Sequence, residues 1–196
     1  MSQAPNALPQ RQIYLVAMGA NLPSRAGPPR QTLSAALNYT GHPTFELINA
    51  SRFFSCPAFP AGNGPDYVNA AASFWGPPHP EDMLAILHSI ENEFGRERKQ
   101  RWGQRTLDLD LIASGDVVLP DEETQSAWRV LEAREQLKRA PAELVLPHPR
   151  LQDRAFVLVP LAEIAPGWLH PILGKTTLEL RDALPPEMLN EMVPLA

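Results

Sequence analysis

The strongest constraint on the fold is the alternation of apolar and acidic residues in Thr106–Ala113. Three leucines alternate there with two aspartates, in the order Leu107, Asp108, Leu109, Asp110 and Leu111. Side chains two residues apart on a strand project from the same face. The segment therefore predicts a strand with a buried leucine face and an acidic face.

The segments before this strand give an order of elements. A helix is predicted up to Gly95 because its apolar residues follow one helical stripe, namely Met83, Ile86, Leu87, Ile90 and Phe94. A further helix is expected at Arg30–Asn38, and strands at Ile13–Met18, Phe45–Phe54 and Tyr67–Phe74. The resulting β-α-β-β-α-β order predicts an α+β, ferredoxin-like fold, an antiparallel sheet with its helices on one face.

Two segments after the last strand are expected to add to this unit. Glu122–Arg139 is predicted as an extra, inserted helix with an apolar face, which is formed by Ala127, Val130, Leu131 and Leu137. Ala155–Ile164 is apolar enough to pack on the core. One domain is therefore expected over residues 12–184, with an inserted helix at about 122–139 and a C-terminal extension. Residues 1–11 and 185–196 are expected to be tails.

Composition limits the classes of function. The chain has 196 residues, a net charge of −5 and one cysteine. A net negative charge argues against nucleic acid or an anionic membrane as partner. No apolar run is long enough to span a bilayer, and the N-terminal segment lacks the apolar core of a secretory signal. One cysteine forms no internal disulfide, so a reducing, cytoplasmic location is expected.

The acidic pair Asp108 and Asp110 is the sharpest chemical feature. Two carboxylates this close repel each other, and Mg²⁺ would relieve that repulsion while keeping places for water and phosphate oxygens. A basic segment, Arg96–Arg105, leads directly into the pair. The segment is compatible with an ordinary solvated loop, but together with the acidic pair it favours a magnesium-dependent polyphosphate site. The chain has no G-x-x-x-x-G-K-[ST] motif, which excludes a P-loop enzyme.

Other candidate residues have two interpretations each. Tyr67 and Asn69 lie two apart on a predicted strand, which suits either a flat heterocycle or a core tyrosine beside a turn-forming asparagine. His148 lies between two prolines and is either a phosphate ligand or a plain loop histidine. Cys56 is interpreted as a small packing residue, not as a nucleophile.

Taken together, these residues resemble the 6-hydroxymethyl-7,8-dihydropterin pyrophosphokinase family. The longest match is Arg101–Leu111, which is similar to the family signature. Three further blocks follow the family order: residues 19–22, residues 65–71, and the Pro147-His148 pair with Arg154 and Phe156. The resemblance implies transfer of the β,γ-pyrophosphate of ATP to the hydroxymethyl oxygen of the pterin.

The resemblance also implies a role for each site residue. Asp108 and Asp110 would bind two Mg²⁺ ions, and Arg96 and Arg105 would complete the catalytic set. The pterin site would consist of Gly19, Cys56, Phe59, Tyr67, Asn69 and Phe156. ATP would contact Glu91, Arg98, Trp102, Leu111, His148 and Arg154. Trp102 would lie on a loop that closes over the substrates.

Two other functions are weighed against this one. A DxD-dependent nucleotidyltransferase or phosphotransferase would use the same acidic pair but transfer a different group. A ferredoxin-like RNA-binding module would carry aromatic side chains on its central strands, whereas Ile13–Met18 offers one, Tyr14. The expected partners are ATP and the pterin, with neither nucleic acid nor membrane, and a monomer is expected.

Overall fold

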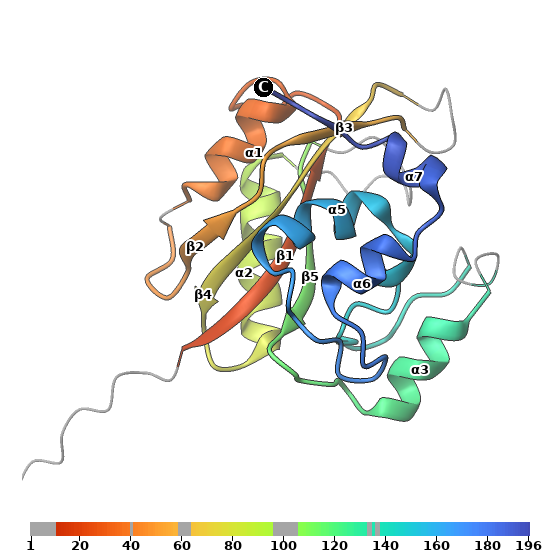
Figure 1. The fold of residues 1–196 in the computed structure, drawn as a ribbon. Helices are drawn as coiled ribbons and strands as arrows, with labels where there is room; N and C mark the ends of the chain where they lie inside the picture. Colours follow the sequence, from red (N-terminus) through yellow and green to blue (C-terminus); the bar gives the residue numbers. More distant parts are fainter. Residues whose placement is uncertain (1–10, 40, 59–63, 96–105, 133–134, 136–137) are drawn as a thin grey trace, which may run out of the picture.

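The computed structural model describes residues 11–39, 41–58, 64–95, 106–132, 135 and 138–196. Within these residues the chain forms a six-stranded antiparallel sheet with the path β5-β1-β4-β3-β6, and β2 also pairs with β4 (Figure 1). The strands are β1 (Gln12–Ala20), β2 (Glu46–Ala50), β3 (Phe54–Cys56), β4 (Tyr67–Gly76), β5 (Asp108–Ser114) and β6 (Val193–Pro194). The helices are α1 (Pro29–Leu37), α2 (Pro80–Glu93), α3 (Glu122–Val130), the 3₁₀ turn η1 (Leu151–Asp153), α5 (Ala155–Ile164), α6 (Thr177–Asp182) and α7 (Pro186–Asn190). The predicted ferredoxin-like order is confirmed, with β2 and β3 together in the place of one predicted strand.

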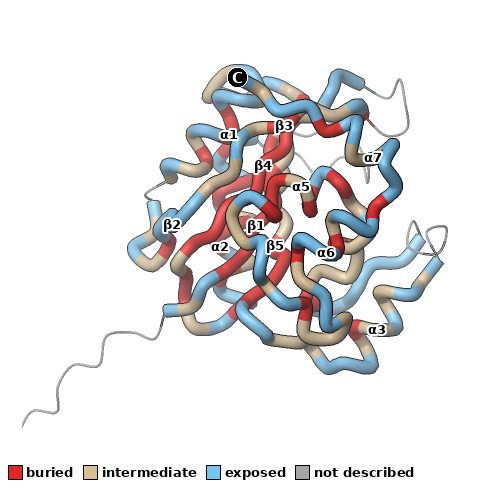
Figure 2. Tube along the Cα trace, viewed as in Figure 1, coloured by how far each residue is buried: buried red, intermediate tan, exposed pale blue. Residues whose placement is uncertain are grey.

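One face of the sheet packs against α1 and α2. The predicted stripe of α2 is buried in this core together with Leu107, Leu109 and Leu111 of the strand region. Tyr14 and Phe74 are the largest fully buried side chains from the two central strands. Figure 2 shows the central strands β1 and β4 as largely buried. The alternation that predicted β5 therefore reflects a leucine face turned toward these two helices.

The opposite face carries a second core built from the C-terminal part of the chain. Val157, Leu158 and Leu161 of α5 pack there against Leu15 and Ala17 of β1. The expectation that Ala155–Ile164 packs on the sheet is confirmed. Residues 185–196, expected as a tail, instead contain α7 and β6, which pairs with β3. Met192 anchors this end because its side chain is buried in the second core.

The inserted helix is shorter than predicted. The prediction of one helix at 122–139 is wrong, because α3 ends at Val130 and Leu131 has an extended backbone, with φ −63° and ψ 131°. Residues 135 and 138 are again helical, and 133–134 and 136–137 lie outside the described residues. Of the predicted apolar face, Ala127 and Val130 are exposed and Leu131 is half-buried, whereas Leu137 lies outside the described residues. Val130 is 70% exposed, whereas the buried residue of α3 is Gln125.

The pairing of β1 with β5 contains a β-bulge. Val16 pairs with Leu111 and Leu15 pairs with Ala113, so Ile112 is the extra residue on β5. The two side chains after Leu111 both lie in the second core, whereas Leu111 lies in the first. A bulge of this kind redirects the strand and its unpaired backbone groups.

Candidate active site

The strand register brings the acidic pair close to the Tyr67/Asn69 pair. Gly19 of β1 is the Cα partner of Asp108 on one side and of Asn69 on the other. Neighbouring strands lie about 4.8 Å apart, so the backbones of Asp108 and Asn69 are separated by roughly 10 Å. Residues in register share a face of the sheet, and this is the face that carries α5. The two candidate clusters therefore lie near each other on one face of the sheet.

The glycine between the clusters has little space around it. A Cβ on Gly19 would lie 3.2 Å from Oδ1 of Asn69 and 3.9 Å from Cδ1 of Tyr67. Any larger residue would push against the amide that is expected to contact the acceptor. A glycine here thus leaves the Asn69 and Tyr67 side chains undisturbed.

The acidic pair could hold a hard cation. Asp108 and Asp110 project from the same face of β5, and the Asp110 side chain is 33% exposed. Among the described residues there is no cluster of three or more His, Cys, Asp or Glu side chains that could hold a metal. The protein would therefore supply two carboxylates, and water and substrate would fill the remaining positions. This donor set fits Mg²⁺, which prefers oxygen ligands and usually keeps several waters.

Arg154 connects the acidic pair to the aromatic side of the site. Its Nη1 lies 3.7 Å from Oδ2 of Asp110, and its guanidinium carbon lies 5.5 Å from the centre of the Phe156 ring. Arg154 is the residue at which α5 begins, so the fixed start of that helix positions it. Phe156 is 37% exposed, which leaves its ring accessible to a ligand.

His148 is held in its neutral form beside this pair. Burial is the main cause that lowers the pKa of His148 to about 3, and the charge of Arg154 lowers it further. The ring Nδ1 accepts a hydrogen bond from the backbone N–H of Arg150 at 3.1 Å. The proton of the neutral ring is therefore assigned to Nε2, which makes Nε2 a donor. Such a donor suits a phosphate or ribose oxygen.

Asn69 is fixed by Cys56 on the neighbouring strand. Its Nδ2 lies 3.1 Å from Sγ of Cys56, and Asn69 itself is 3% exposed. Burial raises the pKa of the Cys56 thiol, although the contact with Asn69 opposes that effect. A thiol with a raised pKa stays protonated at neutral pH and is a poor nucleophile. The structure thus supports the interpretation of Cys56 as a packing residue.

Two residues expected at the ATP pocket lie in the interior. Glu91 of α2 is 1% exposed, and its Oε1 accepts the backbone N–H of Leu109 at 2.8 Å. This bond ties α2 to β5 between the two aspartates. Leu111 is 4% exposed and belongs to the core beneath α2. In this arrangement both residues support the strand that carries the acidic pair.

Several predicted site residues lie outside the described residues. They are Phe59, Arg96, Arg98, Trp102 and Arg105, together with Lys99 and Arg101 of the basic segment. In contrast, Asn21 was given no role although it lies close to the site. It is 3% exposed, and its Nδ2 donates to the carbonyl oxygen of Pro65 at 3.2 Å. In the sequence, the position of Asn21 directly after a buried strand is the feature that could have indicated its bond to the segment before Tyr67.

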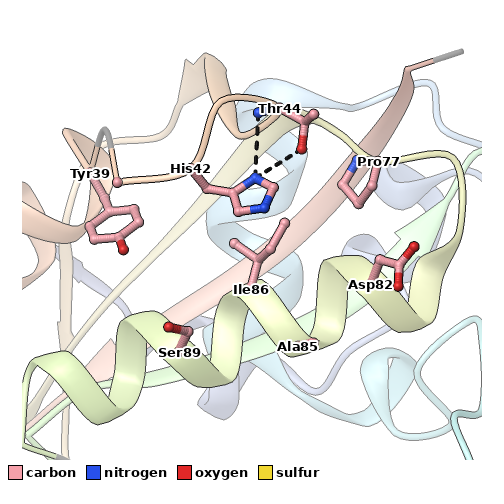
Figure 3. Close-up of a pocket in the computed structure, with 9 residues that line it drawn as sticks. Tyr39, His42, Thr44, Pro77, Asp82, Ala85, Ile86 and Ser89 are labelled. Atoms are coloured by element: carbon pink, nitrogen blue, oxygen red, sulfur yellow. Dashed lines mark hydrogen bonds between the residues drawn. The ribbon is translucent and has the colours of Figure 1, made fainter. Parts of the chain in front are cut away.

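A separate pocket of about 470 Å³ lies between the α1–β2 connection and α2 (Figure 3). Its lining includes Tyr39, His42, Asp82 and Ser89. Thr44 points toward His42, and its Oγ1 lies 3.0 Å from the ring Nδ1. The pocket is on the side of the sheet that carries α1 and α2, opposite the acidic pair. It is therefore not part of the candidate active site.

Similar proteins share both sequence and fold with this chain. A 2-amino-4-hydroxy-6-hydroxymethyldihydropteridine pyrophosphokinase from Pseudomonas aeruginosa is 35% identical over 93% of this chain and 97% of the relative. The protein of the same name from Haemophilus influenzae is 34% identical over 80% of this chain and 83% of the relative. A third, from Synechocystis, is 45% identical, but the match covers 59% of this chain and only 49% of that protein.

The structural comparison points to the same fold. A Plasmodium falciparum HPPK-DHPS crystal structure matches with a TM-score of 0.60 at 14% identity, over 90% of this chain and 42% of the other. At this identity the match shows the fold alone. The model of the family described as 7,8-dihydro-6-hydroxymethylpterin-pyrophosphokinase (HPPK) matches residues 15–166, a span that contains the acidic pair, Tyr67, Asn69 and His148. This chain belongs to that family.

Proposed function

We propose that this chain transfers the β,γ-pyrophosphate of ATP to the hydroxymethyl group of 6-hydroxymethyl-7,8-dihydropterin, as a step of folate biosynthesis. The hydroxymethyl oxygen forms a bond to the β-phosphorus of ATP. The bond between that phosphorus and the bridging oxygen to the α-phosphate breaks, AMP leaves, and the hydroxyl proton is released. The observation that carries the proposal is the row Asp108–Gly19–Asn69 across β5, β1 and β4.

The row supports the proposal because the residues suited to a heterocycle and those suited to a metal ion lie about two strands apart. Asn69 and Tyr67 offer hydrogen bonds and an aromatic ring to a flat heterocycle. Asp108 and Asp110 offer carboxylates to Mg²⁺. The hydroxymethyl group of a pterin bound at Asn69 and Tyr67 would point toward them. Bound Mg²⁺ would neutralise phosphate charge and acidify the acceptor hydroxyl. We propose two such ions.

The remaining residues would orient the nucleotide. Nε2 of His148 would donate to a nucleotide oxygen, and Arg154 would contribute a positive charge beside Asp110. Arg154 would have to exchange part of its contact with Asp110 for a phosphate oxygen when ATP and metal bind. Phe156 and Tyr67 would enclose the pterin ring. Glu91 and Leu111 would act on the nucleotide side through the strand that they support.

The residues outside the described part complete the proposal. Arg96 and Arg105 would stabilise the transferring group, Arg98 and Trp102 would contact ATP, and Phe59 would line the pterin site. No helix among the described residues is both long and apolar enough to cross a membrane. We propose that the protein acts in the cytoplasm as a monomer, without nucleic acid or membrane as partner.

The test is an assay with ATP, Mg²⁺ and 6-hydroxymethyl-7,8-dihydropterin, with separation of all products. The expected products are AMP and the pterin pyrophosphate in equal amounts. Release of inorganic pyrophosphate with an adenylated pterin would instead identify a nucleotidyltransferase and contradict the proposal. The P. aeruginosa relative, run in parallel, provides a reference under the same conditions.

A further inference from the structure

The inserted helix α3 contacts the segment that carries His148. The buried residue of α3 is Gln125, which is fully buried. Its Nε2 donates to the carbonyl oxygen of Pro147 at 3.1 Å. That oxygen belongs to the peptide group immediately before His148. The helix thus reaches the nucleotide side of the site through one side chain.

This peptide group is held from two sides. Its carbonyl is the Pro147 oxygen that accepts from Gln125, and its N–H is that of His148, which donates to the carbonyl oxygen of Ile112 at 2.8 Å. Ile112 is the extra residue of the bulge in β5. Rotation of the peptide plane would break at least one of the two bonds. Because the plane sets the direction in which His148 leaves the backbone, the two bonds together aim its ring.

The insertion is also anchored where it leaves and rejoins the fold. Leu119 and Leu146 exchange backbone hydrogen bonds of 2.9 and 3.1 Å. Asp121 caps the start of α3 by accepting the backbone N–H of Thr124 at 2.7 Å. These contacts fix the first turn of α3, from which Gln125 projects. The donor is therefore held on a short, capped helix and not on a loop.

Packing alone does not explain an amide at this position. Oε1 of Gln125 is buried and has no hydrogen-bond partner among the described residues. A buried carbonyl oxygen without a partner reduces stability, and an apolar residue of similar volume avoids that loss. The gain that offsets it is the bond from Nε2 to Pro147. An apolar residue at this position would lack the bond to the His148 segment.

We propose that Gln125 is a positioning residue for the nucleotide half of the site, which acts through the Pro147 carbonyl to orient His148. The inserted helix is then part of the ATP-binding apparatus. The inference rests on the proposed function, because it takes His148 as a ligand of the nucleotide.

The test is a double-mutant cycle on nucleotide affinity. Binding of the Mg²⁺ complex of α,β-methylene-ATP, in which the bond to be broken is replaced, is measured by calorimetry for the wild type, Q125M, H148A and the double variant. Methionine fills the volume of glutamine but donates no hydrogen bond. We expect Q125M to raise Kd by about tenfold, the loss of roughly one hydrogen bond. The double variant should bind within about twofold of H148A, because the two residues act as a unit.

A matched control separates positioning from general damage to α3. A127G weakens α3 at an exposed position, which lowers stability by about the amount typical of a glycine inside a helix, but leaves the Asp121 cap and the Gln125–Pro147 bond in place. Its nucleotide Kd should stay within about twofold of the wild type while its Tm falls. In steady-state assays, Q125M should raise KM for ATP and leave KM for the pterin unchanged. A loss of affinity in A127G equal to that in Q125M would overturn the inference.

Further outcomes distinguish the inference from the proposed function. Unchanged binding in Q125M, or the same loss from Q125M with and without His148, overturns the inference alone. Unchanged binding in H148A removes the nucleotide role of His148 and the inference with it, whereas AMP production by the wild type still tests the reaction. If Q125M does not fold, the test uses the wild type instead, and the NMR signals of the Gln125 side-chain amide are measured. They should shift when the nucleotide analogue saturates the protein, and unchanged signals overturn the inference.

Discussion

Acid should destabilise this protein in part through His170, a buried histidine on the segment between α5 and α6. Its side chain is fully buried, and its Nδ1 accepts the backbone N–H groups of Ile172 and Leu173, each at 3.2 Å. Burial is the main cause that lowers the pKa of His170 to about 4, and the charge of Arg129 lowers it further. A proton on Nδ1 would break both hydrogen bonds and place a charge in the protein interior.

The sign and size of the effect follow from the two pKa values. In the unfolded chain the pKa is about 6.5, so the unfolded state binds the proton first as pH falls. The stability that depends on neutral His170 is fully present above about pH 6.5. It is lost progressively as pH falls toward the folded pKa, and the loss is complete below it. At pH 5 the loss is about 2 kcal/mol, from about 1.4 kcal/mol per pKa unit over the interval from pH 6.5 to pH 5.

The assay is urea unfolding of the wild type and H170N at pH 7.5 and pH 5. Asparagine carries a carbonyl oxygen that accepts from the same two N–H groups but does not titrate. The fall in unfolding free energy between the two pH values should be about 2 kcal/mol smaller in H170N than in the wild type. His148 titrates in both proteins, so its contribution cancels. Equal falls in the two proteins would refute the reasoning.

Three further predictions concern the candidate site. D110A should lower kcat by several orders of magnitude while circular dichroism and Tm stay close to the wild type; near-normal activity in Mg²⁺ would contradict the metal assignment. Y67A should weaken pterin binding by about tenfold or more and leave binding of the ATP analogue alone unchanged, as calorimetry with each ligand would show. G19A should raise KM for the pterin, because its Cβ would lie 3.2 Å from Oδ1 of Asn69. An unchanged KM in G19A would mean that Asn69 can move without effect.

The parts of the fold that were predicted correctly carry strong local periodicity. The apolar stripe of α2 and the alternation of β5 each reflect burial of one face. The stripe and the leucine face are both buried, as expected. The predicted length of the inserted helix was too great. Apolar residues at helical spacing indicate a helix only where another element covers them, and Val130 is 70% exposed. β6 was missed because a strand of two residues has no periodicity to detect.

The site was predictable in its components but not in their arrangement. The motifs identified the acidic pair and Tyr67 with Asn69, whereas their proximity depends on the register that places Gly19 between them. The bond between Gln125 and Pro147 joins residues 22 positions apart, one on α3 and one in the loop before η1. No periodic pattern relates such residues. Long-range hydrogen bonds of this kind are determined by how the elements pack.

The bulge in β5 limits how the sheet can be engineered. Deletion of Ile112 would leave the neighbouring Cα pairs of β1 and β5 in register and give a more regular ladder, which designers of stable scaffolds prefer. The same deletion would remove the carbonyl that accepts the N–H of His148. With Ile112 deleted, the strand pairing is regular but His148 loses its anchor. With Ile112 present, the reverse holds. A more stable scaffold made from this chain, if it is to keep the nucleotide side intact, has to retain the irregularity and gain its stability elsewhere.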